Sequence, residues 1–348
     1  MPLHFIQNDI AKVKADILVN SANPEVAIGT GCDANLHAAA GPQLFEARKK
    51  IGPIATGEAC ITDAYNLPAK YVIHTVAPIW QDGHHKEGML LKRCYDNCLK
   101  LAEEYKADSI AFPLLSTGNY AFPKDLALDI AVNKCEKWLK DHELTIYIVV
   151  YDRESYQISL DLHHEVETFI NNALSIEPAP SLTYGQRRKL LASMSSAPYV
   201  LHEQEEADDE IVSYEPAVCY TGALSLSSID GLPEFKAGKS FQDTLFEFCD
   251  RSGMSDPEIY KRANMDRKLF SKIKNPKYLP RKNTILSLAI ALRLNLKDTN
   301  RLLASAGYAM SDGQVSDIII RYFIQTKHYD IYDINTVLFE YHQPTLGV

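Results

Sequence analysis

Four short apolar runs in the first half of the chain constrain its fold more than any other feature. They are ADILVNSA (15–22), YVIHTVA (71–77), SIAFPLL (109–115) and TIYIVVY (145–151). Near-continuous apolar character is typical of strands that are buried on both faces of a parallel sheet. Helical patterns alternate with these runs at 42–51, 90–105, 124–142 and 155–174. The alternation predicts an α/β fold, with a mostly parallel sheet that helices cover on both faces.

The pattern changes twice along the 348 residues. Between 175 and 240 the periodicity is lost, and HEQEEADDE (202–210) holds six acidic residues and no basic one. From 241 onward the pattern is purely helical, with a cap and a stop around each short helix. We therefore predict an α/β domain over 1–174, a partly acidic linker over 175–240 and a smaller all-α domain over 241–348.

Composition excludes several classes of protein. No run approaches eighteen apolar residues, so we expect no membrane span, and the N-terminus lacks the features of a signal peptide.

The seven cysteines are scattered. Cys94 and Cys98 lie one helical turn apart, but no second pair completes a metal site, so we expect neither a metal nor a cofactor. Reduced thiols in a cytoplasmic protein are the better interpretation.

Polar residues crowd the loop that follows the first apolar run. Asn20 ends the run, Asn23 follows three residues later, and Gly29 and Gly31 permit positive φ or a close approach of the backbone. Asp33 is expected to be the N-cap of a helix over 34–40. A glycine-containing loop that leads into a helix N-terminus presents N–H groups to an anion. These residues alone fit an ordinary capped turn equally well.

A second loop has the same character. PLLSTGNYAFP follows another buried strand and supplies polar or small residues, namely Ser116, Thr117, Gly118 and Asn119. Two such loops at adjacent strand ends would hold a diphosphate from both sides. Neither loop is a nucleotide-binding P-loop or the dinucleotide-binding glycine motif, because the spacing of both motifs is absent.

At this point a resemblance to a known family emerges. NDI (8–10), VNSAN (19–23), GCDANLHAAAG (31–41), LPAKYVIHTVAPIW (67–80) and FPLLSTGNYAFP (112–123) resemble, in order, the motifs of MacroD-like macrodomains, the ADP-ribose-binding modules. The resemblance implies a three-layer α/β/α fold and a pocket for ADP-ribose, either free or carried by a modified protein or metabolite.

The resemblance also implies roles for individual residues. Asp9 would accept a hydrogen bond from the adenine amino group beside Ile10, and Tyr151 would lie next to the adenine. The loop over 116–121 would cradle the diphosphate, with Tyr120 beside the distal ribose. Asn23 and Asp33 match the polar pair that distinguishes hydrolytic members from pure binders. The remaining pocket residues are expected to be Asn20, Gly29, Gly31, Cys32, Ser116, Thr117, Gly118 and Asn119.

The first loop departs from the hydrolytic pattern. It has two glycines where such members usually have a longer run, and Ile28, Thr30 and Cys32 place side chains near the expected distal ribose. Hydrolysis of an ADP-ribosyl or O-acetyl-ADP-ribose ester is therefore weighed against a reader that binds without turnover. His37 and His74 are interpreted as structural residues.

The helical region over roughly 241–305 resembles a helix-turn-helix unit of the repressor type. Lys268, Lys272 and Lys274 would lie on or near its second helix, where such units contact DNA phosphates. The alternatives are an ADP-ribose-responsive regulator that binds DNA, and a helical domain that docks a protein partner or packs with a solvated basic face.

Overall fold

In the computed structural model, residues 2–151, 160–174 and 239–347 are described. The predicted linker over 175–240 lies almost entirely outside these ranges, and so do its acidic run and Cys219. None of the helices in the described ranges combines the length and apolar composition that a membrane crossing requires.

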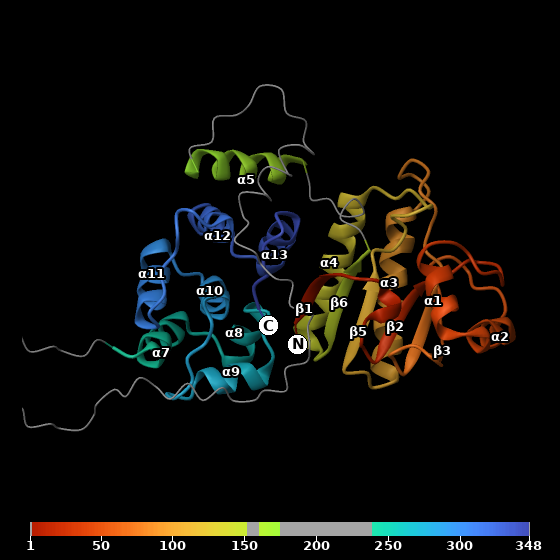
Figure 1. Cartoon of the computed structure of the whole chain (residues 1–348), viewed down its shortest axis with the longest axis horizontal. Helices are drawn as coiled ribbons and strands as arrows, with labels where there is room; N and C mark the ends of the chain where they lie inside the picture. The colour runs from red at the N-terminus through yellow and green to blue at the C-terminus, as the bar shows by residue number, and fades with distance from the viewer. Residues whose placement is uncertain (1, 152–159, 175–238, 348) are drawn as a thin grey trace, which may run out of the picture.

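A six-stranded sheet forms the centre of the N-terminal part (Figure 1). Its order is β1-β6-β5-β2-β4-β3, and every pairing is parallel except that of β3 with β4. The bounds are β1 (Leu3–Gln7), β2 (Ile17–Ser21), β3 (Ala59–Asp63), β4 (Tyr71–Thr75), β5 (Ser109–Pro113) and β6 (Thr145–Val150). The four predicted strands are confirmed. The two that sequence reasoning missed, β1 and β3, are the edge strands.

Helices cover both faces of this sheet, and the alternation of side chains along β2 shows how. Ile17 and Val19 belong to the apolar cluster that contains Leu91 and Leu128, whereas Leu18 packs with Leu36 on the opposite face. This period of two is what an extended strand imposes. The predicted α/β/α fold is confirmed. The helices are α1 (Cys32–Ala40), α2 (Pro42–Ile51), α3 (Glu87–Glu104) and α4 (Lys124–Asp141).

The C-terminal part is helical, as predicted. Its described helices are α7 (Phe241–Ser252), α8 (Asp256–Arg262), α9 (Arg267–Ile273), α10 (Lys282–Ala291), α11 (Leu296–Ser305), α12 (Val315–Gln325) and α13 (Ile331–Glu340). Capping boxes that begin at Ser240 and Ser255 start α7 and α8. Every residue of α10 from Thr284 to Ala291 is buried, so the other helices are arranged around it.

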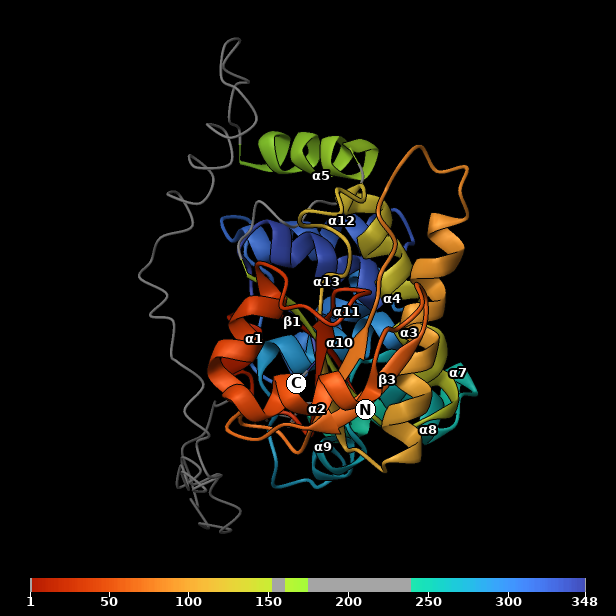
Figure 2. The same ribbon diagram turned by 90° about the vertical axis from the view of Figure 1, so that its right-hand side faces the viewer.

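The C-terminal helices pack against the β1 edge of the sheet. Phe5 of β1 lies 6.0 Å, ring to ring, from Phe339 of α13. Helix α5 (Leu160–Ala173) lies beside α12, where the Tyr322 hydroxyl donates to Glu165 at 2.6 Å. Figure 1 shows β1 facing these helices, and in Figure 2 the sheet lies in front of them. One apolar cluster therefore runs from the sheet into the helical part.

Candidate functional site

The strand order places the predicted polar loops side by side at the carboxyl ends of the parallel strands. The loops after β5 and β2 are neighbours because these strands pair directly. The ends of β1 and β6 are also neighbours, since Asn8 N–H donates to the Val150 carbonyl at 3.2 Å. Three strand spacings separate β1 from β2, which is about 14 Å. The carboxyl ends of parallel strands are where α/β proteins bind ligands.

The first loop is built around its two glycines. Gly31, with φ of 61°, precedes α1 as its N-cap, a conformation that favours glycine. The prediction that Asp33 is the N-cap of a helix over 34–40 was wrong, because α1 begins at Cys32 and Asp33 lies in its first turn. At Gly29 a β-carbon would stand 3.2 Å from Asp33 Oδ2. Glycine at 29 thus permits the backbone to approach the carboxylate.

Asp33 is held from several sides and is only 3% exposed. Its Oδ2 accepts the Gly29 N–H at 2.5 Å, and its Oδ1 accepts Asn20 Nδ2 at 2.5 Å. His37 Nε2, one helical turn onward, lies 3.5 Å from Oδ1. Burial lowers the pKa of His37, and the charge of Asp33 opposes that shift. The carboxylate is therefore anchored in one orientation. His37 contacts it directly, which the structural interpretation of this histidine did not anticipate.

Asn20 lies behind Asp33 and is fully buried. Its amide nitrogen also lies 3.2 Å from His74 Nδ1, and His74 Nε2 lies 3.0 Å from Thr62 Oγ1. Burial lowers the pKa of His74 to about 3, so the ring is neutral. This geometry agrees with the interpretation of His74 as a satisfied strand histidine. Sequence reasoning missed Thr62, because the edge strand that carries it was not recognised.

Asn23 occupies a turn close to the surface. Its Oδ1 accepts the Glu25 N–H at 3.0 Å, and its carbonyl accepts Arg48 Nη2 at 3.5 Å. Arg48 is buried and also donates to the Gly52 carbonyl. The arginine of α2 thereby holds the backbone on which Asn23 stands. This contact also escaped sequence reasoning, because nothing in the pattern of α2 marks Arg48 as buried.

The second loop is tightly constrained. Ser116 has φ of 66°, a left-handed conformation that is unusual for serine. Its hydroxyl donates to the Pro78 carbonyl at 2.9 Å, and its own carbonyl accepts the Phe122 N–H at 3.0 Å. The Thr117 hydroxyl donates to the Leu114 carbonyl at 2.9 Å. Both hydroxyls therefore stabilise the loop itself, so the predicted contacts with a diphosphate would come from its backbone.

The two loops are joined to each other. Asn119 Nδ2 donates to Thr30 Oγ1 at 2.5 Å. Among the described residues, the N–H groups of Thr117, Gly118 and Asn119 have no acceptor, and no side chain caps the first turn of α1. A β-carbon at Gly118 would meet nothing within 4 Å. The joined loops thus combine unpaired N–H groups with open space, which suits an anion.

The predicted adenine residues lie at the other end of the edge. The Asp9 carboxylate caps the short 3₁₀ helix η1 (Ile10–Lys12) by accepting the Ala11 N–H at 3.0 Å through Oδ1. The Ile10 side chain is packed in the core at 5% exposure, so the predicted contact with the adenine would involve only its backbone. Tyr151 is 67% exposed, and the loop that follows it, 152–156, lies outside the described residues.

Two further residues belong to the predicted pocket. Burial raises the pKa of the Cys32 thiol to about 12, so this residue is a neutral thiol and not a thiolate nucleophile. Tyr120 is half-buried, and its carbonyl accepts the Trp80 N–H at 2.9 Å. This bond connects the second loop to the segment that precedes α3.

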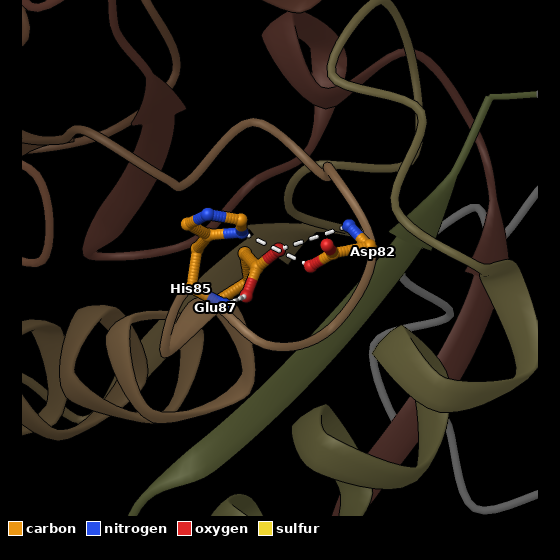
Figure 3. A group of neighbouring side chains, drawn as sticks. All are labelled: Asp82, His85 and Glu87. Carbon is orange, nitrogen blue, oxygen red and sulfur yellow. Dashed lines mark hydrogen bonds and ion pairs between the residues drawn. The ribbon is translucent and has the colours of Figure 1, made fainter.

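That segment contains Asp82, His85 and Glu87, whose ligand atoms lie within 4.8 Å of one another (Figure 3). Glu87 Oε1 accepts three backbone N–H groups, from residues 81–83, and Oε2 accepts the His85 N–H at 2.7 Å. These bonds hold the pKa of Glu87 near 2 against the effect of burial. Because the backbone already satisfies its carboxylate, Glu87 is a residue that closes this turn. Cys94 and Cys98 are likewise buried in the core of α3.

The three predicted phosphate-contacting lysines differ in their surroundings. Lys268 and Lys272 are exposed on the outer side of α9, opposite the buried Phe270. Lys274 forms an ion pair with Asp256 and lies 5.2 Å from the centre of the Phe270 ring. The positive face of α9 is therefore smaller than the sequence suggested.

Comparisons with known proteins bear on the family of this chain. The family model described as Macro domain matches residues 19–131. A macro domain-containing protein of Methanosarcina mazei is 45% identical over 155 residues, which cover 44% of this chain and 83% of that protein. The O-acetyl-ADP-ribose deacetylase of Escherichia fergusonii is 46% identical over 162 residues, which cover 45% of this chain and 92% of that protein.

A solved structure described as the Oceanobacillus iheyensis macrodomain with ADP aligns at 33% identity with a TM-score of 0.44, covering 48% of this chain and 92% of that one. The identity to the deacetylase extends over nearly the whole length of that relative. The chain therefore belongs to the macro domain family and is related to O-acetyl-ADP-ribose deacetylases.

Proposed function

We propose that the protein binds ADP-ribose across the carboxyl ends of the strands from β1 to β2, and that it hydrolyses ADP-ribosyl esters, of proteins or of O-acetyl-ADP-ribose. The observation that carries the proposal is the pair of loops that Asn119 and Thr30 join at the carboxyl ends of β5 and β2. These loops bring together the unpaired N–H groups of 117–119 and the uncapped first turn of α1. Such groups stabilise the charge of a diphosphate without a metal ion.

The anchored carboxylate supplies the chemistry. Hydrolysis of an ADP-ribosyl ester adds water across the ester and releases ADP-ribose and a carboxylic acid. Asp33 Oδ1 faces both Asn20 Nδ2 and His37 Nε2, whereas Oδ2 accepts only the Gly29 N–H, so Oδ2 retains a lone pair that can orient a water molecule or a ribose hydroxyl. Asn23 would fix the distal ribose. Positioning of this kind lowers the barrier by several kcal/mol without a strong base.

The test is to incubate the full chain with ADP-ribosylated protein and with O-acetyl-ADP-ribose, and to follow the release of free ADP-ribose and of acetate. Asn23→Ala and Asp33→Asn should each lower turnover by about 100-fold. Their affinity for ADP-ribose, measured by calorimetry, should change less than about fivefold, which is under 1 kcal/mol. Full activity in both variants would contradict the hydrolytic mechanism.

A non-catalytic reader is the alternative for the same pocket. It is favoured by Thr30, whose side chain accepts Asn119 where hydrolytic members usually have glycine. A chain that binds ADP-ribose but releases no product from either substrate would support the reader. A chain that fails to bind ADP-ribose would contradict both functions.

For the C-terminal helices we propose docking of an acidic partner, which is either duplex DNA or an acidic protein. The exposure of Lys268 and Lys272 on the outer side of α9 supports this proposal. The turn between α8 and α9 is buried against β1, which limits a partner's access to one side of this helix pair. Both partners predict binding that weakens with salt.

A further inference from the structure

We propose that Thr62 and His74 are positioning residues that fix the Asp33 carboxylate through Asn20. The proposal rests on the function stated above, since it gives a catalytic purpose to a polar chain lying beneath the first loop. The chain starts on the edge strand β3, crosses β4 and β2, and ends in the first turn of α1. Neither Thr62 nor His74 belongs to the predicted pocket.

Each link in this chain is short and buried. Thr62 Oγ1 lies 3.0 Å from His74 Nε2, His74 Nδ1 lies 3.2 Å from Asn20 Nδ2, and that same nitrogen lies 2.5 Å from Asp33 Oδ1. Asn20 and His74 are fully buried, and Thr62 is 9% exposed. Water therefore does not substitute for any of the three links.

The direction of every hydrogen bond follows from Asp33. A carboxylate only accepts hydrogen bonds, so Asn20 must turn its NH₂ group toward it. The second hydrogen of that NH₂ group then points at His74 Nδ1, which must be the unprotonated nitrogen of the ring. A neutral histidine carries its proton on the other nitrogen, so Nε2 donates to the Thr62 hydroxyl. The Thr62 hydroxyl rotates to accept this hydrogen bond, and it thereby stabilises the tautomer that Asn20 requires.

Asp33 Oδ1 and His74 Nδ1 are the two acceptors that orient the Asn20 amide. Asn20 Oδ1 is buried and has no hydrogen-bond partner, so nothing on that side holds the group in place. If His74 changed tautomer, its Nδ1–H would oppose the Asn20 NH₂ group, donor against donor. The amide would then rotate and turn its oxygen toward Asp33, which would displace the carboxylate.

The experiment compares Thr62→Val with Thr62→Ser in the full chain. Valine has the shape of threonine and suits a strand, but it gives His74 Nε2 no acceptor, whereas serine retains the hydroxyl. We expect Thr62→Val to lower turnover of the ester substrate about 10- to 100-fold, because a misplaced catalytic group costs rate at this scale. Thr62→Ser should stay within about threefold of the unaltered chain. ADP-ribose affinity should be equal in all three, since Asp33 would act on the reacting centre.

A second measurement does not depend on turnover. Nitrogen-detected spectra of the histidine rings should show His74 protonated at Nε2 in the unaltered chain and in Thr62→Ser. In Thr62→Val we expect a substantial fraction protonated at Nδ1. Equal turnover and an unchanged His74 tautomer in Thr62→Val would overturn the proposal. An unaltered chain without turnover would overturn the proposed hydrolase, and the spectra would then still decide whether Thr62 controls the residue that holds Asn20.

Discussion

The side chain of Asn264 pairs with the backbone of Leu3 as a neighbouring strand would. Its Oδ1 accepts the Leu3 N–H at 2.8 Å, and its Nδ2 donates to the Leu3 carbonyl at 2.9 Å. Leu3 lies on β1, the edge strand whose other end leads to Asp9, and Asn264 lies in the turn between α8 and α9. The turn between α8 and α9 is therefore one point at which the C-terminal helices protect the edge strand β1.

Asn264→Gly should destabilise the protein. Glycine adopts the positive φ of 54° without strain, so the loss of stability reports the removed amide contacts. Without them, the Leu3 N–H and carbonyl are left unpaired. We expect the free energy of unfolding to fall by about 2–4 kcal/mol, measured by denaturant titration. Asn264→Ala should lose about 1 kcal/mol more, because alanine is strained at this φ. An Asn264→Gly variant as stable as the original would show that the Asn264 amide does not contribute to joining the two parts.

Asp9→Asn should weaken ADP-ribose binding while sparing the fold. Asparagine caps a helix as well as aspartate does, so the bond from the Ala11 N–H is retained. The amide cannot supply the charged acceptor that the adenine amino group would use, and we expect about a tenfold loss of affinity by calorimetry, or ~1.4 kcal/mol. Asp63→Asn, on the far edge strand β3, is the matched control. Unchanged affinity in Asp9→Asn would remove the adenine role.

Gly118→Ala should reduce ligand affinity without a change in stability. The alanine methyl would meet no atom within 4 Å, so the melting temperature should be preserved. The same methyl would occupy space in front of the N–H groups that cradle the diphosphate, and we expect at least tenfold weaker ADP-ribose binding, about 1.4 kcal/mol. Gly313→Ala, far along the chain, controls for a general effect of alanine. Normal affinity in Gly118→Ala would place the diphosphate elsewhere.

His74 should make the protein less stable in acid. Burial lowers its pKa in the folded chain from the ordinary 6.5 to about 3, so the unfolded chain binds a proton at pH values where the folded chain does not. The contribution of neutral His74 to the free energy of unfolding is fully present above about pH 6.5. It is lost as the pH falls toward 3, with a slope of about 1.4 kcal/mol per pH unit. His74→Asn should remove this slope from the dependence of the unfolding free energy on pH between about 3 and 6.5. His84→Asn, on an exposed loop, should leave the dependence unchanged. Parallel curves for both variants would contradict this.

Lys268→Ala combined with Lys272→Ala should weaken binding to duplex DNA if DNA is the partner of α9. Each phosphate contact contributes about 0.9 to the slope of log affinity against log salt, so the double variant should lose about 2 from that slope. Lys297→Ala, an exposed lysine of α11, should retain the original slope. If the full chain shows no DNA binding even at low salt, an acidic protein becomes the better partner.

Local patterns in the sequence were enough to predict most elements of the fold. Apolar runs marked the four inner strands, because a strand covered on both faces has no polar side. Serine caps and terminal glycines marked the helices, and glycine with asparagine marked both pocket loops. The edge strands β1 and β3 escaped, because an edge strand has a less apolar pattern and its pairing partner lies far away in sequence.

What the sequence determined by itself is which residues are polar at the ends of buried strands and which glycines the loops require. Tertiary structure decided the rest. Pairing of β5 with β2 brought Asn119 to Thr30, and burial turned Asn20 inward, toward Asp33 and His74. Packing against β1 enclosed Asn264 in the turn of the helix pair. The physical reason is that the direction of a polar side chain depends on acceptors and burial supplied by distant residues, which no local pattern records.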